Sequence, residues 1–490
     1  MASIANVHSL SETKRRLLDR YLRQGPAQQP GCASAITPRP LAEPTPLSLS
    51  QEQIFLREEL VPEIPPLYNE SVTVYRFGSM DVDLLERSFT EVIRRHEIWR
   101  TTYHTVNGAT LQTVNPAPKH IRLPFIDLRA VPEKERLAET IRLLSEDARR
   151  KFDMQQGPLI YASLVRFSEQ ESRLYLIVHQ SILDGVSVYQ VLLDELSTLY
   201  SAYSRGETPT LPEPAIQFGD YAAWQRRTLQ GEVLEKQLDY WREQLAGELP
   251  VLAWPASRRP SRQSFRGSIE PFTLPKTLSS AMKILAQRAG STLFVGLLSS
   301  FVLLLHLYTK QDDLIVGTVS PAGRKRSEAQ RLIGYFLNPV PLRFRLRGLN
   351  SFLDLVAHVQ AVLGGAITHD DIPFEHLVKQ LQPKPDPSRN PFFTVAASLE
   401  PPLAGVGPQW NLTPMDLESG GARWDLYFVW DDRPKEMIGR VQYNPDLFAR
   451  EEIHSMLRDF RQVLEKVLDD PGQRIFDVML SGSISAAKSI

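Results

Sequence analysis

A histidine followed by an amide side chain stands where a buried strand is expected to meet a polar turn. The two residues are His179 and Gln180, and the pair Asp184 and Gly185 follows shortly after them. An imidazole can exchange a proton near neutral pH, whereas a glutamine amide only donates and accepts hydrogen bonds. A strand that leads a histidine into a loop is one way to place a base at a cleft. A histidine at a strand end is nevertheless more often structural, and Asp-Gly is an ordinary turn pair, so this stretch alone does not establish an enzyme.

The segment that carries these residues runs from Arg173 to Leu196 (RLYLIVHQSILDGVSVYQVLLDEL). Its pattern predicts a buried strand, a tight turn and an amphipathic helix. Neighbouring residues on an extended strand point to opposite faces. If the strand continues through His179 and Gln180 faces a cleft, the imidazole faces away from that cleft. We therefore favour a structural role for His179, with direct catalysis as the alternative.

The composition excludes several classes of protein. Lys and Arg (56) nearly balance Asp and Glu (57), so nucleic acid is not an expected partner. The single cysteine, Cys32, excludes an internal disulfide and a thiolate metal site, which fits a reducing cytoplasm. No apolar run reaches the roughly 18 residues of a membrane span. Met1 to Leu10 lacks the pattern of a secretory signal, so we expect a cytoplasmic protein without a membrane partner.

The periodicity of the chain predicts an α/β fold with two lobes. At 490 residues the chain exceeds the roughly 250–300 residues at which a single core stops growing. Residues 1–45 are expected to form a short helix (9–24) and a linker, because residues 25–46 contain six prolines. We expect an N-terminal lobe at 46–225 and a C-terminal lobe at 226–490. Helices are predicted at 82–96, 134–150, 218–245, 279–289, 293–308, 352–364 and 450–468, and strands at 71–77, 173–179 and 314–318.

Further short motifs follow one another in a fixed order. They are PLSLSQ (46–51), RHEIWRTTY (95–103), FD with GPL (152–159), FGDYAAWQ (218–225), YWR (240–242), YTKQDDLIVGTVSPAGR (308–324), LIGYFLNPVPLR (332–343), PFE (373–375), RNPFF (389–393), WDL (424–426) and YNPDLF (443–448). Over about residues 46–470 this set resembles the condensation domains of nonribosomal peptide synthetases. The HHxxxDG signature of that family is matched by residues 179–185, except that Gln180 stands at the second histidine. Each motif is weak, but the ordered set is specific.

The resemblance implies a fold and a reaction. The fold is a pseudodimer of two chloramphenicol-acetyltransferase-like α/β lobes in a V arrangement with a central tunnel. The enzyme is an acyltransferase that forms an amide, because the acceptor amine attacks the donor thioester and the donor thiol leaves. No intrinsic cofactor or metal is implied, since 4'-phosphopantetheine arms come from an upstream donor and a downstream acceptor carrier protein. Neighbouring synthetase domains are the other implied partners.

The resemblance also carries roles to individual residues. The candidate catalytic residues are His179, Gln180, Asp184, Gly185 and Asn338. Asp184 is expected to form a structural ion pair with Arg324, which we favour over direct catalysis. A glutamine can position an amine but cannot take its proton. A general base typically accelerates such a reaction by ~10²–10⁴-fold, and positioning of the two reactants can accelerate it more. Because Gln180 can supply positioning but not a base, we expect atypical or reduced catalysis.

Alternatives remain at this point. A condensation-like domain without chemistry, acting as a scaffold or recruiting platform, is the second hypothesis, and Gln180 is the residue that favours it. An engineered replacement of histidine is a third explanation of Gln180. A free-standing acyltransferase that forms esters from coenzyme A is a weaker option. The variant Gln180→His separates an active site from a platform.

Overall fold

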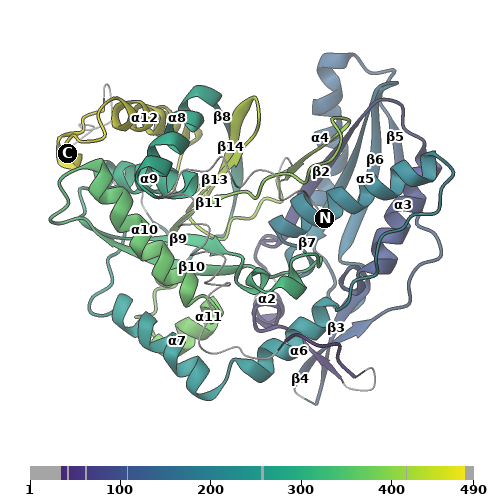
Figure 1. Ribbon diagram of the computed structural model, residues 1–490, viewed down its shortest axis with the longest axis horizontal. Helices are drawn as coiled ribbons and strands as arrows, with labels where there is room; N and C mark the ends of the chain where they lie inside the picture. Colours follow the sequence, from purple (N-terminus) through teal and green to yellow (C-terminus); the bar gives the residue numbers. More distant parts are fainter. Residues whose placement is uncertain are drawn as a thin grey trace, which may run out of the picture.

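Two lobes lie side by side, each built on a mixed β-sheet with helices against it (Figure 1). The structure is a computed structural model that describes residues 35–40, 44–60, 63–107, 109–254, 259–414 and 417–480. The predicted helix at 9–24, most of the linker and Cys32 lie outside the described residues. The predicted α/β class and the two-lobed architecture are confirmed.

The sheet of the first lobe has the strand order β12-β2-β7-β6-β5. Its strands are β2 (Asn69–Phe77), β5 (Phe125–Asp127), β6 (Ile160–Ser168), β7 (Glu171–His179) and β12 (Trp410–Pro414). A smaller sheet contains β1 (Thr45–Pro46), β3 (Thr101–Val106) and β4 (Ala109–Val114). In β7 the apolar run from Leu174 to Val178 is buried throughout, as expected of a strand covered on both faces.

The helices of the first lobe bury apolar residues in the first hydrophobic core. They are α2 (Leu49–Leu60), α3 (Val82–Arg95), α4 (Arg136–Ala148), α5 (Leu193–Ser204) and α6 (Phe218–Thr228). Helix α3 begins after Asp81, whose carboxylate accepts a hydrogen bond from the amide of Leu84 (3.1 Å). Leu85, Phe89 and Val92 recur at helical spacing and are buried, and α3 packs against α5.

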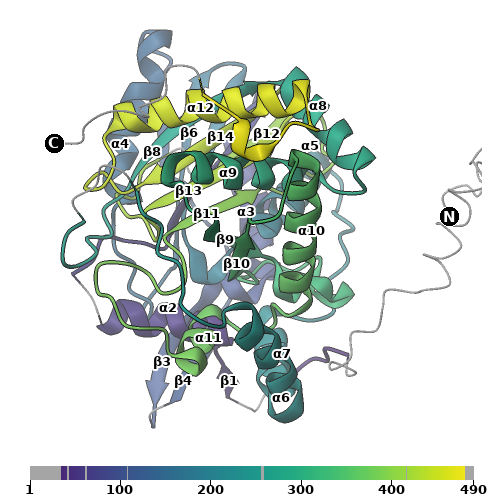
Figure 2. The same cartoon turned by 90° about the vertical axis from the view of Figure 1, so that its left-hand side faces the viewer.

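The second lobe has a six-stranded sheet in the order β10-β9-β11-β13-β14-β8. Its strands are β8 (Ser268–Pro275), β9 (Asp313–Ser320), β10 (Asn338–Arg345), β11 (Val395–Leu399), β13 (Leu426–Asp432) and β14 (Glu436–Tyr443). Its helices are α7 (Gly231–Gln244), α8 (Lys276–Arg288), α9 (Leu293–Thr309), α10 (Phe352–Thr368), α11 (Phe374–Leu381) and α12 (Arg450–Asp469). Figure 2 shows α9, α10 and α12 on the side of the sheet that faces away from the first lobe.

Within the described residues, no single helix has both the length and the apolar composition of a membrane span. Helices α8 and α9 meet both conditions only when they are counted together, and they are bent by 103° at the break between them.

One strand from the second half of the chain completes the sheet of the first lobe. β12 pairs antiparallel with β2, and Trp410 and Leu412 join the first hydrophobic core. Next to it, Ser71 Oγ donates to the carbonyl of Leu417 (3.2 Å) and accepts from its amide (3.0 Å). The predicted lobe boundaries at residues 46 and 225 stay predictions, and this crossing means that the lobes are not two consecutive segments of chain.

The single helix predicted at 218–245 is wrong in one respect. The structure has two helices, α6 and α7, with a break at Leu229 and Gln230. Gly231 adopts a φ of 53°, a left-handed conformation that favours glycine and interrupts a helix. The two helices therefore follow different directions as the chain passes from one lobe to the other.

Candidate active site between the lobes

The turn after β7 directs His179 and Gln180 to opposite sides of the sheet. β7 ends at His179, and a short 3₁₀ turn of Gln180–Ile182 follows. In the antiparallel register, Asn69 stands opposite His179 and Glu70 opposite Val178. Residues paired in this way share a face, as do residues two apart on one strand. Glu70 therefore lies on the face of Gln180.

The side-chain amide of Gln180 connects the two lobes. Its Nε2 donates to Glu70 Oε1 (2.9 Å), and its Oε1 accepts from Nη1 of Arg423 in the second half of the chain (2.7 Å). A carboxylate only accepts and a guanidinium only donates, so these partners fix the orientation of the amide. Gln180 is 3% exposed, and its backbone amide donates to the carbonyl of Tyr68 (2.7 Å). One N–H and one lone pair of the amide remain for another group.

Charged groups surround this amide. Burial raises the pKa of Glu70, and the positive charges of Arg423 and Arg440 only partly oppose that effect. The guanidinium carbon of Arg423 also lies 4.7 Å from the centre of the Trp424 ring. The junction thus holds a partly buried carboxyl group on one side of Gln180 and a partly buried cation on the other.

His179 lies in a separate environment. Its Nδ1 is 2.7 Å from Ser181 Oγ, and its Nε2 is 3.2 Å from a Glu58 carboxylate oxygen without hydrogen-bond geometry. The rings of Phe152 and Tyr68 pack against the imidazole. The residue is 1% exposed. These contacts favour the structural role that we expect for His179, and none of them involves the Gln180 amide.

The carboxylate of Asp184 accepts hydrogen bonds from the residues around it. Arg324 donates from Nη2 to Oδ1 (2.7 Å) and from Nε to Oδ2 (3.1 Å), which is the ion pair expected from the sequence. The amides of Ser187 and Phe336 also donate to the carboxylate (2.7 and 3.3 Å). Both oxygens are therefore used, and the contacts favour a structural role over a catalytic one.

Gly185 opens the helical stretch that follows the turn. This stretch contains a π-helical segment, Ser187–Leu192, before α5 begins. A Cβ atom at Gly185 would lie 3.2 Å from Glu400 Oε2 and 3.5 Å from Pro401 Cδ. Glycine thus allows the second lobe to approach closely at this point.

The side-chain amide of Asn338 forms hydrogen bonds with backbone groups. Its Nδ2 donates to the carbonyls of Asp370 (2.8 Å) and Ile372 (2.7 Å), and its Oδ1 accepts from the amide of Phe374 (2.9 Å). These bonds hold the start of α11 against β10. A catalytic role for Asn338 stays a prediction, and its contacts favour positioning.

A small cavity of about 40 Å³ lies between the lobes beside this site. It is lined by Ser50, Gln53, Ile54, Arg57 and Tyr68 of the first lobe and by Tyr335, Asn338, Pro339, Phe374, Glu375, Asn390, Arg423 and Trp424 of the second half of the chain. Burial raises the pKa of Glu375, against the charges of Arg57 and Arg423. Arg423 lines the cavity and donates a hydrogen bond to Gln180, so only the Arg423 side chain separates the Gln180 amide from the cavity. No cluster of metal-ligating residues occurs among the described residues.

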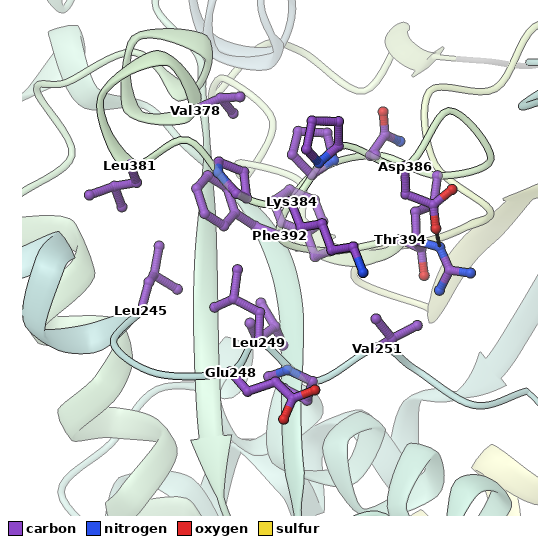
Figure 3. Close-up of a pocket in the computed structure, with 18 of the residues that line it drawn as sticks. Leu245, Glu248, Leu249, Val251, Val378, Leu381, Lys384, Asp386, Phe392 and Thr394 are labelled. Carbon is purple, nitrogen blue, oxygen red and sulfur yellow. Dashed lines mark ion pairs between the residues drawn. The ribbon is translucent and has the colours of Figure 1, made fainter.

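A larger cavity, of about 1310 Å³, lies elsewhere. It is in the second lobe, where residues 245–252 face α11 and the loop 383–394 (Figure 3). Its lining includes none of the predicted site residues. A third cavity, of about 520 Å³, contains Glu58 and Phe152 and so lies on the side of His179. We take the junction at Gln180 as the candidate site because the Gln180 amide joins the two lobes there and Asn338 lines the cavity beside it.

Sequence reasoning missed three charged residues of the site: Glu70, Arg423 and Glu375. The β2–β7 register could have indicated Glu70, because it shares a face with Gln180. Glu375 belongs to the PFE motif, and Arg423 precedes the WDL motif. Nothing local in the sequence indicates that Arg423 reaches Gln180, 243 residues away.

Known proteins resemble this chain in sequence and in fold. A linear gramicidin synthase of Brevibacillus parabrevis is 39% identical over 451 residues, which cover 91% of this chain and 6% of that protein. The X-domain of teicoplanin biosynthesis, solved in complex with OxyB, is 28% identical with a TM-score of 0.74, over 91% of this chain and 99% of that chain. The first condensation domain of the calcium-dependent antibiotic synthetase shares the fold at 19% identity, with a TM-score of 0.78 over 90% of this chain and 100% of that one.

The chain spans only a small part of the curated relatives, between 6% and 8% of the first three. The family described as "Condensation domain" matches residues 42–488. This chain therefore belongs to the condensation domain family.

Proposed function

We propose that this chain transfers a donor acyl group from a thioester to the amine of an acceptor aminoacyl group, and that Gln180 replaces the basic histidine of the family signature. Both groups would arrive on the 4'-phosphopantetheine arms of carrier proteins, with neighbouring synthetase domains as further partners. The observation that carries the proposal is the position of the Gln180 amide, which joins the two lobes beside the cavity between them. Amide formation in a synthetase assembly line fits the family and its relatives.

Positioning is the contribution that Gln180 can make. The amine nitrogen attacks the thioester carbon, the carbonyl oxygen gains negative charge, and the carbon–sulfur bond then breaks to release the donor thiol. The free lone pair of Gln180 Oε1 can accept a hydrogen bond from the amine and hold it for attack. Two tethered reactants held in this way react much faster than free ones. Asp184 takes no part, because both of its oxygens are already bonded.

The test is an intact-mass assay with two separate carriers. The donor carrier is loaded with a set of acyl and aminoacyl groups, and the acceptor carrier with each proteinogenic amino acid in turn. Transfer adds the donor mass to the acceptor carrier only when the chain is present. Gln180→His is expected to raise the rate, by at most the ~10²–10⁴-fold that base assistance is worth.

Gln180→Leu is the matched control, since it keeps a side chain of similar size without hydrogen bonds. We expect it to lower transfer below that of the unchanged chain. If the unchanged chain and Gln180→His both stay silent with every pair, while their unfolding transitions are intact, the transferase proposal is overturned.

A second candidate is a recruiting platform without transfer. Two observations favour it: Arg423 already occupies one lone pair of Gln180, and the teicoplanin X-domain, 28% identical to this chain, forms a complex with OxyB. A platform binds a tailoring enzyme whether or not Gln180 is changed. Isothermal titration calorimetry with such an enzyme from the same assembly line measures this directly.

A further inference from the structure

Glu70 brings a carboxylate into direct contact with the amide of Gln180. Its Oε1 lies 2.9 Å from Gln180 Nε2, because β2 and β7 place the two side chains on one face. Glu70 is surrounded by protein but keeps part of its surface accessible to solvent. We expect this combination of protein contacts and partial solvent exposure of a side chain that lines a channel.

The charges around Glu70 leave its carboxylate available. Arg423 precedes β13, Arg440 lies on β14 and Glu400 follows β11, and all three act on Glu70. Arg440 is paired with Glu400, and Arg423 donates to Gln180. Among the described residues, the hydrogen bond of the Glu70 side chain goes to the neutral amide of Gln180. Glu70 is therefore held in place without being neutralised by an ion pair.

We propose that Glu70 accepts the proton of the acceptor amine during acyl transfer, in the role that an imidazole at position 180 would have. This inference rests on the proposed transferase function. The amine nitrogen forms a bond to the thioester carbon, and the carbonyl electron pair moves onto oxygen. The proton of the resulting ammonium passes to the Glu70 carboxylate. When the carbonyl re-forms, the carbon–sulfur bond breaks and the thiolate takes the proton back from Glu70, which leaves an amide, a thiol and an ionised Glu70.

The geometry supports this step in two ways. Glu70 is bonded to the Nε2 atom of the same amide whose Oε1 would hold the amine, so we expect one bridging water to connect the amine with Glu70. The positive charge of Arg423 beside the same oxygen disfavours an ammonium ion there, which opposes the attraction of an ammonium ion to Glu70. Burial also raises the pKa of Glu70, which makes its carboxylate a stronger base than an exposed one.

The experiment is a double-mutant cycle with Glu70→Gln and Gln180→His in the loaded-carrier assay. Glu70→Gln keeps an acceptor for Gln180 Nε2 but cannot take a proton. We expect it to lower the transfer rate by ~10²-fold or more in the unchanged chain and by much less in the Gln180→His background, where an imidazole can replace it. A purely structural role of Glu70 lowers the rate equally in both backgrounds, and that result would overturn the inference.

Two further measurements separate the possible failures. Sodium formate is expected to restore transfer to a Glu70→Ala variant, because a small carboxylate can enter the space and take the proton; no restoration counts against the inference. Glu171→Gln, at the other end of the β2–β7 pair, is the control and is expected to leave the rate unchanged. If the unchanged chain transfers and Glu70→Gln transfers equally well, this inference fails and the proposed function stands. If the unchanged chain is silent and Gln180→His transfers, this inference fails and the proposed function stands. If neither protein transfers, both fail.

Discussion

Arg324 covers both carboxylate oxygens of Asp184 across 140 residues of sequence, with the two side chains almost completely buried. Removal of one partner leaves a buried charge without compensation, which costs about 3–5 kcal/mol. We therefore expect Arg324→Ala to lower the free energy of unfolding by that amount in urea denaturation.

The control for this prediction is Arg331→Ala. Arg331 pairs with Asp194 at 2.8 Å, but its side chain is 63% exposed. Exposed pairs contribute about 0–1 kcal/mol. Equal losses in the two variants would contradict a special role for the buried pair.

His179 is expected to affect stability more than transfer. His179→Asn keeps a short polar group that can still bond Ser181, whereas His179→Ala leaves the buried Ser181 hydroxyl without this partner. Loss of a buried hydrogen bond costs about 1–3 kcal/mol. Thermal unfolding and the loaded-carrier assay, run on both variants, check this. A folded His179→Asn protein with no transfer would instead assign His179 a direct part in the reaction.

Glu195 is expected to make the first lobe sensitive to acid. Burial acts to raise its pKa, but hydrogen bonds from His96 and Arg95 outweigh burial and lower the pKa to about 2. Because the folded pKa lies below the unfolded value, this carboxylate stabilises the fold above about pH 4.3, and the contribution is lost as the pH falls towards 2. The contribution of Glu195 to the free energy of unfolding is roughly 3 kcal/mol at neutral pH.

The measurement is the free energy of unfolding between pH 2 and pH 7 for the unchanged chain and for Glu195→Gln. The variant should be less stable at neutral pH and should lose less stability on acidification. Parallel curves for the two proteins would be the contrary result.

Two glycines of the second lobe should respond to alanine with opposite signs. A Cβ at Gly317 would lie 2.0 Å from the Phe393 ring, so Gly317→Ala forces that ring to move and costs about 1–3 kcal/mol. Gly364 lies inside α10 with no atom within 4 Å of its added Cβ. Gly364→Ala is expected to stabilise by about 0.5–1 kcal/mol, because alanine favours the helix. Calorimetry on the two variants compares the shifts in Tm.

Local pattern was sufficient for most elements of the fold. The predicted strand at 173–179 is β7, and the predicted helix at 450–468 is α12 to within one residue. The helix predicted to stop at Gly364 continues to Thr368. Tertiary packing explains the difference, since a Cβ at Gly365 would meet the Tyr240 hydroxyl at 2.7 Å, so glycine there permits close contact with α7. Gly365 therefore allows α10 and α7 to pack closely, and it does not end α10.

The site was less predictable because its partners come from distant segments. The turn with Gln180 and Asp184 is encoded locally, and family resemblance indicated Arg324. Arg423 reaches Gln180 from a loop in the second half of the chain, and periodicity carries no information about such a contact. Glu70 follows from strand register, which a single sequence does not specify until the pairing is known.

The pairing of β12, from the second half of the chain, with β2 of the first lobe has a consequence for synthesis on the ribosome. The bond between Ser71 and Leu417 joins residues 346 positions apart, so β2 leaves the ribosome roughly 20–70 s before its partner at 5–20 residues per second. During that interval the edge of β2 offers unpaired backbone groups to any other strand. The nascent first lobe consequently passes through a stage in which this edge is open to pairing with a strand of a neighbouring nascent chain.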